Sequence, residues 1–265
     1  MTLETSRSTV AFEPLLTAGA RSGLTSPAMR WLLAPAALAW LALFWLSGGD
    51  HALTLCLAPR GTLFEGLFAN VTAGFAAVTP GRWAIEWALM IVAMMFPLLV
   101  PMVRHVAARN FATQRERSVG LFIAGYSMIW LSAGAVSGVA LVVARAGFET
   151  IHLAPWAGLI GCALAALWQL SSAKMRAVNR CHGTVPLRPW PPDAGRDAIG
   201  FGLLHGTRCM RACLPVMVLP MVGGHGLVAM AAVSAVLLAE RARPRPQYGP
   251  SAIILLLLGL LTLTA

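Results

Sequence analysis

Seven stretches of the chain are apolar over lengths close to what a helix needs to cross a lipid bilayer. Such a helix takes about 20 mostly apolar residues, with about 17 to 25 tolerated. The stretches are residues 29–46, 83–103, 119–144, 151–171, 198–222, 224–240 and 248–265. They predict an all-α protein, a polytopic transmembrane helix bundle of about seven spans over residues 29–265. Residues 1–28, which precede the first stretch, are predicted to be an N-terminal tail.

The composition excludes an ordinary soluble domain. Only 11% of the residues are charged and 58% are hydrophobic, whereas soluble domains carry about 25% charged residues. A net charge of +10 would suggest a nucleic-acid partner in a soluble protein. Here the basic residues lie between long apolar stretches, so we expect the lipid bilayer as the surrounding partner and no nucleic acid.

The distribution of basic residues predicts the orientation of the bundle. Lys and Arg accumulate in the cytoplasmic loops of membrane proteins. Of the 20 basic residues, 15 fall in the tail and alternate connections, and 3 fall in the connections between them. This asymmetry predicts that the N-terminus and its tail are cytoplasmic and that the C-terminus lies outside. The remaining two, Arg208 and Arg211, lie within the fifth apolar stretch.

The fifth stretch carries the residues with the strongest chemical signal. His205, Cys209, Cys213 and Met217 follow one another at intervals of four residues, which places them along one side of a helix. An imidazole, two thiols and a thioether are typical ligands of a soft metal ion, with Cu(I) the preferred ion and zinc the second candidate. The alternative is that cysteine and methionine fill an apolar core.

Arg208 and Arg211 indicate a function or a partner of some kind. A cation in mid-membrane costs about 2.5–3.5 kcal/mol on insertion scales, so such residues are usually functional or paired. Arg208 lies on the same side of the predicted helix as His205 and Cys209. It could favour the thiolate form of a nearby cysteine, hold an anionic ligand, or pair with Glu86 or Glu240.

Methionines of the second stretch are further candidate ligands. Met90 and Met94 share one face of the predicted helix, and Met95 follows directly. Thioethers are ligands of Cu(I), which makes Met94 and Met95 candidates for the same metal site. The alternative is again packing, because methionine fills irregular gaps in apolar cores.

One polar segment between the first two spans has helical spacing. Apolar residues such as Phe64, Leu67 and Phe75 alternate there with Glu65 and other polar residues. We expect an amphipathic helix lying in the membrane interface, and a helix packed on the bundle is the alternative.

Three blocks of sequence resemble DUF2182, a family of bacterial integral membrane proteins with predicted metal binding. The first block is Trp87-x2-Met90-x2-Ala93-Met94-Met95-x-Pro97. The second is Trp168-Gln169-Leu170-x3-Lys174, with Cys181 after it. The third is Gly202-x2-His205-Gly206-x2-Cys209-x3-Cys213-x3-Met217, followed by a helix that ends in Glu240 and a basic residue. Together the blocks cover residues 83–243. Separately, Cys181 and His182 form an adjacent pair that could bind a metal ion or be inert.

The chain departs from the family pattern at four positions. Arg211, Ala212 and Leu214 stand where the family usually has Gly, Cys and Trp, and Ala177 stands where a cysteine is common. The chain therefore keeps one thiol fewer in each of the last two blocks. Arg211 also adds a positive charge near the expected cation.

The resemblance and the side-chain spacing together predict a multi-pass protein of the bacterial inner membrane. It would bind or move a soft metal ion, copper before zinc, as a transporter or as a delivery factor for a metal-dependent membrane complex, and it would not be an enzyme. The predicted ligands are His205, Cys209 and Cys213, with Met94, Met95 and Met217 contributing. The alternative is a structural or assembly subunit without metal, in which Arg208 and Arg211 dock a partner or an anionic lipid.

Overall fold

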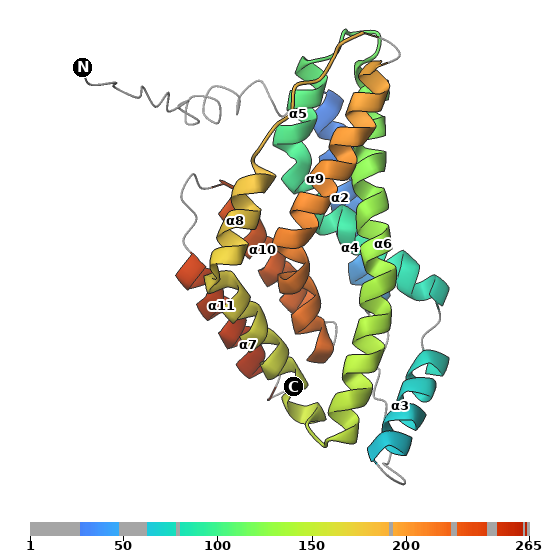
Figure 1. Cartoon of the computed structure of the whole chain (residues 1–265), viewed down its shortest axis with the longest axis vertical. Helices are drawn as coiled ribbons and strands as arrows, with labels where there is room; N and C mark the ends of the chain where they lie inside the picture. Colours follow the sequence, from blue (N-terminus) through green and yellow to red (C-terminus); the bar gives the residue numbers. More distant parts are fainter. Residues whose placement is uncertain are drawn as a thin grey trace, which may run out of the picture.

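The computed structural model describes residues 27–47, 63–77, 80–190, 193–223, 227–242, 248–261 and 263. These residues form ten α-helices and three short 3-10 helices, and these ranges contain no strand, so the all-α prediction is confirmed (Figure 1). The predicted tail, residues 1–28, lies almost entirely outside the described residues. The α-helices are α2 (Pro27–Ser47), α3 (Leu63–Ala77), α4 (Pro80–Met95), α5 (Val100–Ala108), α6 (Arg115–Thr150), α7 (Ala157–Leu170), α8 (Ser172–Cys181), α9 (Asp193–Val218), α10 (Leu227–Ala242) and α11 (Tyr248–Leu261).

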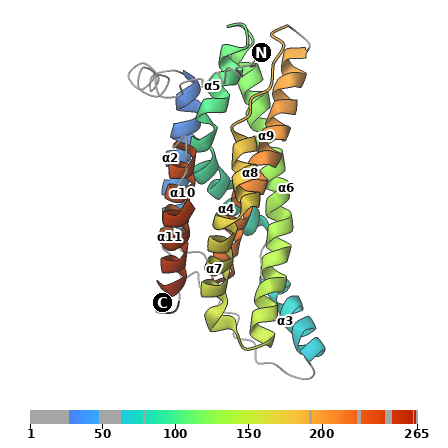
Figure 2. The ribbon, with the colours of Figure 1, turned by 60° about the vertical axis from the view of Figure 1, so that its left-hand side comes forward.

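Helices α6 and α9 lie side by side, with α6 along one side of the bundle (Figures 1 and 2). Glycines bring their backbones close together. A Cβ atom added to Gly202 of α9 would lie 2.2 Å from the Phe122 carbonyl oxygen of α6. A Cβ atom on Gly125 of α6 would lie 2.6 Å from the Ile199 carbonyl oxygen of α9. Only glycine permits this approach, as at other close helix crossings in membranes.

We expect Gly202→Ala to destabilise the protein by about 1–3 kcal/mol, because the methyl group would push α6 and α9 apart. Gly200→Ala is the matched control, because nothing lies within 4 Å of its added Cβ atom. Alanine is the better helix former by about 1 kcal/mol, so the control should be neutral or stabilising. Thermal unfolding in detergent measures both variants, and equal shifts would contradict the prediction.

Each predicted apolar stretch coincides with helical structure, but the lengths differ. Helix α6 has 36 residues, about 54 Å at 1.5 Å per residue, and is long and apolar enough to cross a membrane. Two further spans are counted if each bent pair is one span: Gly81–Met95 with Pro97–Ala108, bent by 43°, and Ala154–Leu170 with Ser172–Cys181, bent by 69°. By length and composition the described residues therefore contain one to three spans, and the seven-span bundle is not confirmed.

The polar segment before the second stretch forms α3, which packs on the C-terminal half of α6 (Figure 2). The Asn70 amide nitrogen donates a hydrogen bond to the Thr150 hydroxyl over 3.1 Å, and both residues are buried. A Cβ atom on Gly74 would lie 2.9 Å from the Val142 side chain. The structure thus favours the packed helix over the predicted interfacial one.

Candidate metal centre

The four residues spaced along α9 face the interior of the bundle. His205 and Cys209 are 0% exposed, and Cys213 and Met217 are 3% exposed. Their spacing of four residues keeps them on one side of the helix, and that side packs on α6, α7 and α8. The stripe is therefore shielded from the surroundings of the bundle.

Three cysteines meet on this side of α9, and we call Cys181, Cys209 and Cys213 the thiol cluster. The Cys209 and Cys213 sulfur atoms are 3.9 Å apart. Cys181, the last residue of α8, is buried and lies near Cys209. The Tyr126 hydroxyl of α6 donates to the Cys209 sulfur over 3.3 Å. Cys209 is thus the central thiol, contacted from α6 and its own helix.

Arg241, in the last turn of α10, completes the surroundings of Cys209. Its Nη2 atom donates to the Cys209 sulfur over 3.5 Å. Within the described ranges no carboxylate lies in salt-bridge range of Arg241. A guanidinium against a thiol favours the thiolate, the form that binds metals.

His205 is buried without a hydrogen-bond partner. Neither Nδ1 nor Nε2 has a partner among the described residues. The ring lies among Phe122, Tyr126 and Phe201, with ring centroids 5.9–6.1 Å from its own. Buried polar atoms are nearly always satisfied, and leaving one unsatisfied costs about 1–3 kcal/mol. A histidine with both nitrogens available one turn from Cys209 suits a metal ligand.

A buried ion pair fixes α9 beside the thiol cluster. The Lys174 Nζ atom lies 3.0 Å from Glu240 Oε2 and donates to the Ala212 carbonyl oxygen over 3.0 Å. Gln169 also donates to the Glu240 carboxylate, and the Trp168 indole nitrogen donates to the Ala212 carbonyl over 3.4 Å. The network therefore ties α7, α8 and α10 to the residue that precedes Cys213.

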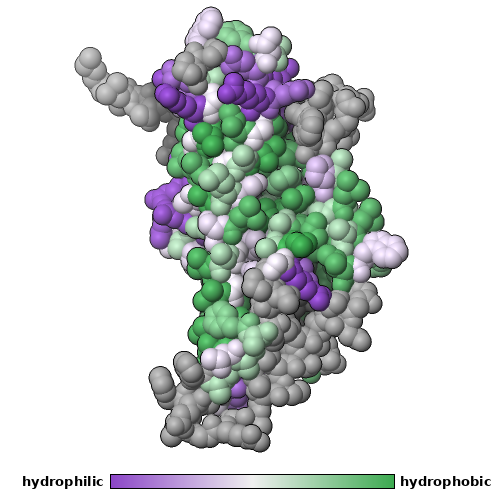
Figure 3. Space-filling model, turned by 90° about the vertical axis from the view of Figure 1, so that its right-hand side faces the viewer, coloured by the Kyte–Doolittle hydropathy of each residue, from purple (hydrophilic) through white to green (hydrophobic). Residues whose placement is uncertain are grey.

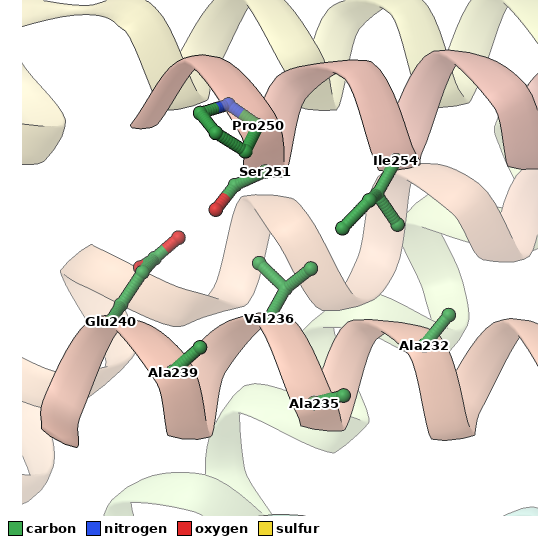
Figure 4. A pocket seen from close by; sticks show the side chains of 8 residues that line it. All are labelled: Ala232, Ala235, Val236, Ala239, Glu240, Pro250, Ser251 and Ile254. Atoms are coloured by element: carbon green, nitrogen blue, oxygen red, sulfur yellow. The ribbon is translucent and has the colours of Figure 1, made fainter. Parts of the chain in front are cut away.

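A cavity of about 450 Å³ lies between α10 and α11, next to this ion pair. Glu240 and Ser251 place their oxygens at one end of the cavity, and alanine, valine and isoleucine line the rest (Figure 4). The Glu240 carboxylate therefore contacts Lys174 and Gln169 and also borders this mostly apolar cavity.

The structure separates Arg208, Arg211 and Glu86. The Arg208 Nη1 atom donates to the Gly183 carbonyl oxygen over 3.2 Å, and Arg211 is exposed. Glu86 pairs with Arg82 over 2.7 Å, and Glu240 pairs with Lys174. Neither acid pairs with Arg208, so the alternative that Arg208 forms an ion pair with Glu86 or Glu240 is wrong.

Met94 and Met95 are buried in the same core as the α9 stripe. Their helix, α4, packs mainly on α2 and α6 rather than on α9. Their role as ligands, and that of Met217, stays a prediction.

The described donors do not form a four-ligand site of the zinc type. Across the described part of the chain, no group of three or more His, Cys, Asp or Glu side chains could hold one ion. Structural zinc sites take four ligands at about 2.0–2.3 Å. Two sulfur atoms 3.9 Å apart can both reach one ion at such bond lengths, and thiolates select Cu(I).

The bundle buries three thiols and a histidine that has no hydrogen-bond partner among the described residues, and thiolates are ligands that soft metal ions prefer. The family model of PpoB2, described as a copper chaperone, matches residues 84–262, about two thirds of the chain. The chain belongs to this family. The match confirms a copper-related family but does not name DUF2182. No curated protein and no solved structure matches the chain.

Sequence reasoning identified the stripe on α9 but missed three of its neighbours. Arg241 was counted as an orientation signal, and Tyr126 carried no signal at all. Cys181 was part of the second block and of the Cys181-His182 pair, but neither observation linked it to Cys209. The block that contains Lys174 and ends near Cys181 was the one available hint that α8 belongs to the site.

Proposed function

We propose that the protein is a membrane copper chaperone that binds one Cu(I) ion at the thiol cluster and passes it to a copper-dependent membrane complex. The observation that carries the proposal is the buried Cys209–Cys213 pair, 3.9 Å apart, with Cys181 near Cys209. Membership of a copper chaperone family supports it. The residues with chemical reactivity bind and release an ion, so we propose no enzymatic step.

The apolar surface supports a membrane location, which we propose is multi-pass in the bacterial inner membrane. The distribution of basic residues supports an N-terminus inside and a C-terminus outside. Large hydrophobic side chains are exposed on several helices, among them Phe44, Trp45, Val136 and Leu257. On the face drawn in Figure 3, hydrophobic residues cover most of the middle, and hydrophilic ones gather at one end and in smaller patches elsewhere. Soluble monomers rarely expose apolar patches of this extent. The proposed bundle of about seven spans would bury this surface in lipid.

In the proposed mechanism, copper is cargo. Two thiols of the cluster lose their protons and bond Cu(I), because the thiolate is the metal ligand. His205, one turn before Cys209 on α9, would support the two thiols without completing a three-ligand site, because no three His, Cys, Asp or Glu side chains converge on one position in the described residues. A partner's soft ligand then displaces these donors one at a time, so the ion is never released to water. No phosphate-binding loop occurs in the sequence, which favours transfer by ligand exchange.

Copper binding by the purified protein tests the proposal. We expect about one Cu(I) ion per chain under reducing, anaerobic conditions, measured by competition with a chromogenic chelator. His205→Ala should lower the affinity about 10- to 100-fold, the range found even for residues that only support metal ligands. His105→Ala is the matched control, because that ring already hydrogen-bonds the Val185 carbonyl oxygen over 3.0 Å.

Absence of Cu(I) binding by the wild-type protein would overturn the proposal. The alternative of an assembly subunit would then gain support if a co-purified partner were lost on Arg208→Ala and kept on Cys209→Ser.

A further inference from the structure

Arg241 places a positive charge beside a site that is proposed to bind a cation. Its Nη2 atom contacts the Cys209 sulfur at 3.5 Å. An arginine so placed repels an incoming metal ion, yet it also compensates the thiolates that hold that ion. Which effect dominates depends on the charge of the ion.

The other charges beside the thiol cluster cancel. Lys174 acts on Cys181 and Cys213, but Glu240 neutralises it over 3.0 Å. No carboxylate is among the strongest charges acting on the three thiols in the described part of the chain. Arg241, which forms no ion pair with a described carboxylate, is therefore an uncompensated charge beside the thiolates.

The buried site favours the ion that leaves it electrically neutral. Two thiolates, Arg241 and Cu(I) sum to zero, and the two thiol protons leave as the ion binds. Two thiolates, Arg241 and Zn(II) sum to one positive charge, which is costly to bury in an apolar bundle. A third thiolate would neutralise zinc, but no three such ligands converge on one position in the described ranges.

We propose that Arg241 sets the metal preference of the site, selecting a monovalent soft cation over a divalent one by charge balance. This inference rests on the proposed binding of Cu(I) at the thiol cluster. It assigns Arg241 a role in specificity, as a counter-charge that is not itself a ligand.

The affinities for Cu(I), Ag(I) and Zn(II), measured by chelator competition on the purified full-length chain, test this role. Arg241→Gln should lower the preference for Cu(I) over Zn(II) at least about tenfold, because one full charge next to the ions is lost. Arg241→Lys should keep most of the preference. Arg241→Glu should shift the preference further toward Zn(II).

Arg180→Gln is the matched control. It removes a positive charge adjacent in sequence to Cys181, but the Arg180 side chain is exposed, so both affinities should be unchanged. Equal losses of Cu(I) and Zn(II) affinity in Arg241→Gln, or an unchanged preference in Arg241→Glu, would overturn the inference while the wild-type protein still binds copper. A wild-type protein that binds no Cu(I) would overturn the proposed function and the inference together.

Discussion

Cys209→Ser is expected to lower the affinity for Cu(I) at least about a hundredfold, the largest loss of any single substitution at the site. Replacing a residue that only supports a metal ligand lowers metal affinity about 10- to 100-fold. Cys209 should matter more, because it is the thiol that the other groups surround. Serine keeps the size and can still accept the hydrogen bond that Tyr126 donates. It replaces a soft sulfur by a hard oxygen, which Cu(I) binds poorly.

Cys162→Ser provides the control for this substitution. Cys162 is also a buried thiol, but it lies on α7 against Gly259 of α11, away from the cluster. We expect unchanged copper affinity in that variant and a smaller loss in Cys213→Ser than in Cys209→Ser. Equal affinities of Cys209→Ser and the wild-type protein would remove the thiol cluster as the binding site.

The helices could be predicted because the signal for each is local. A long apolar stretch specifies a helix regardless of its neighbours, and each predicted stretch coincides with helical structure. Their ends could not be predicted in the same way. The third stretch was expected to stop before Arg145, yet α6 continues to Thr150. The Arg145 guanidinium donates to the Met221 and Val222 carbonyl oxygens over 2.7 and 3.3 Å, and this long-range contact satisfies the charge within the helix.

The site divides in the same way between local and long-range information. The α9 stripe follows from spacing within one helix, so His205, Cys209, Cys213 and Met217 were found together. Tyr126 reaches Cys209 across 83 residues of sequence and Arg241 reaches it across 32. No periodicity encodes such contacts, and a basic residue at a helix end has the same appearance whether it faces the cytoplasm or a thiol.

The number of membrane spans depends on packing as well as on the apolar content of each helix. Helix α9 carries Arg208 and Arg211 as well as a buried histidine, which lowers its apolar content although one side packs in the centre of the bundle. Length and composition therefore identify α6 readily and leave α9 out. The packing of α9 on α6 places it in the bundle, whereas its apolar content alone does not.

Lys174→Met is expected to destabilise the folded protein by about 3–5 kcal/mol, because it leaves the Glu240 carboxylate buried without its counter-charge. The pair is almost fully enclosed, at 0% exposure for Lys174 and 4% for Glu240. Loss of the ammonium group also removes one of two side-chain donors to the Ala212 carbonyl oxygen, next to Cys213. Thermal or denaturant unfolding in detergent measures the effect, with copper affinity as a second readout.

The double variant Lys174→Met, Glu240→Leu should recover most of this loss. Replacing a whole buried ion pair by apolar groups is often neutral, whereas removing one partner is not, so the two substitutions should be strongly non-additive. Leucine at position 240 would also face the mostly apolar cavity between α10 and α11 (Figure 4). Glu86→Gln breaks the exposed Arg82–Glu86 pair and should cost less than about 0.5 kcal/mol. If Lys174→Met cost no more than this control, or if the double variant were the sum of its parts, the buried pair would not be what fixes α9 to α8 and α10.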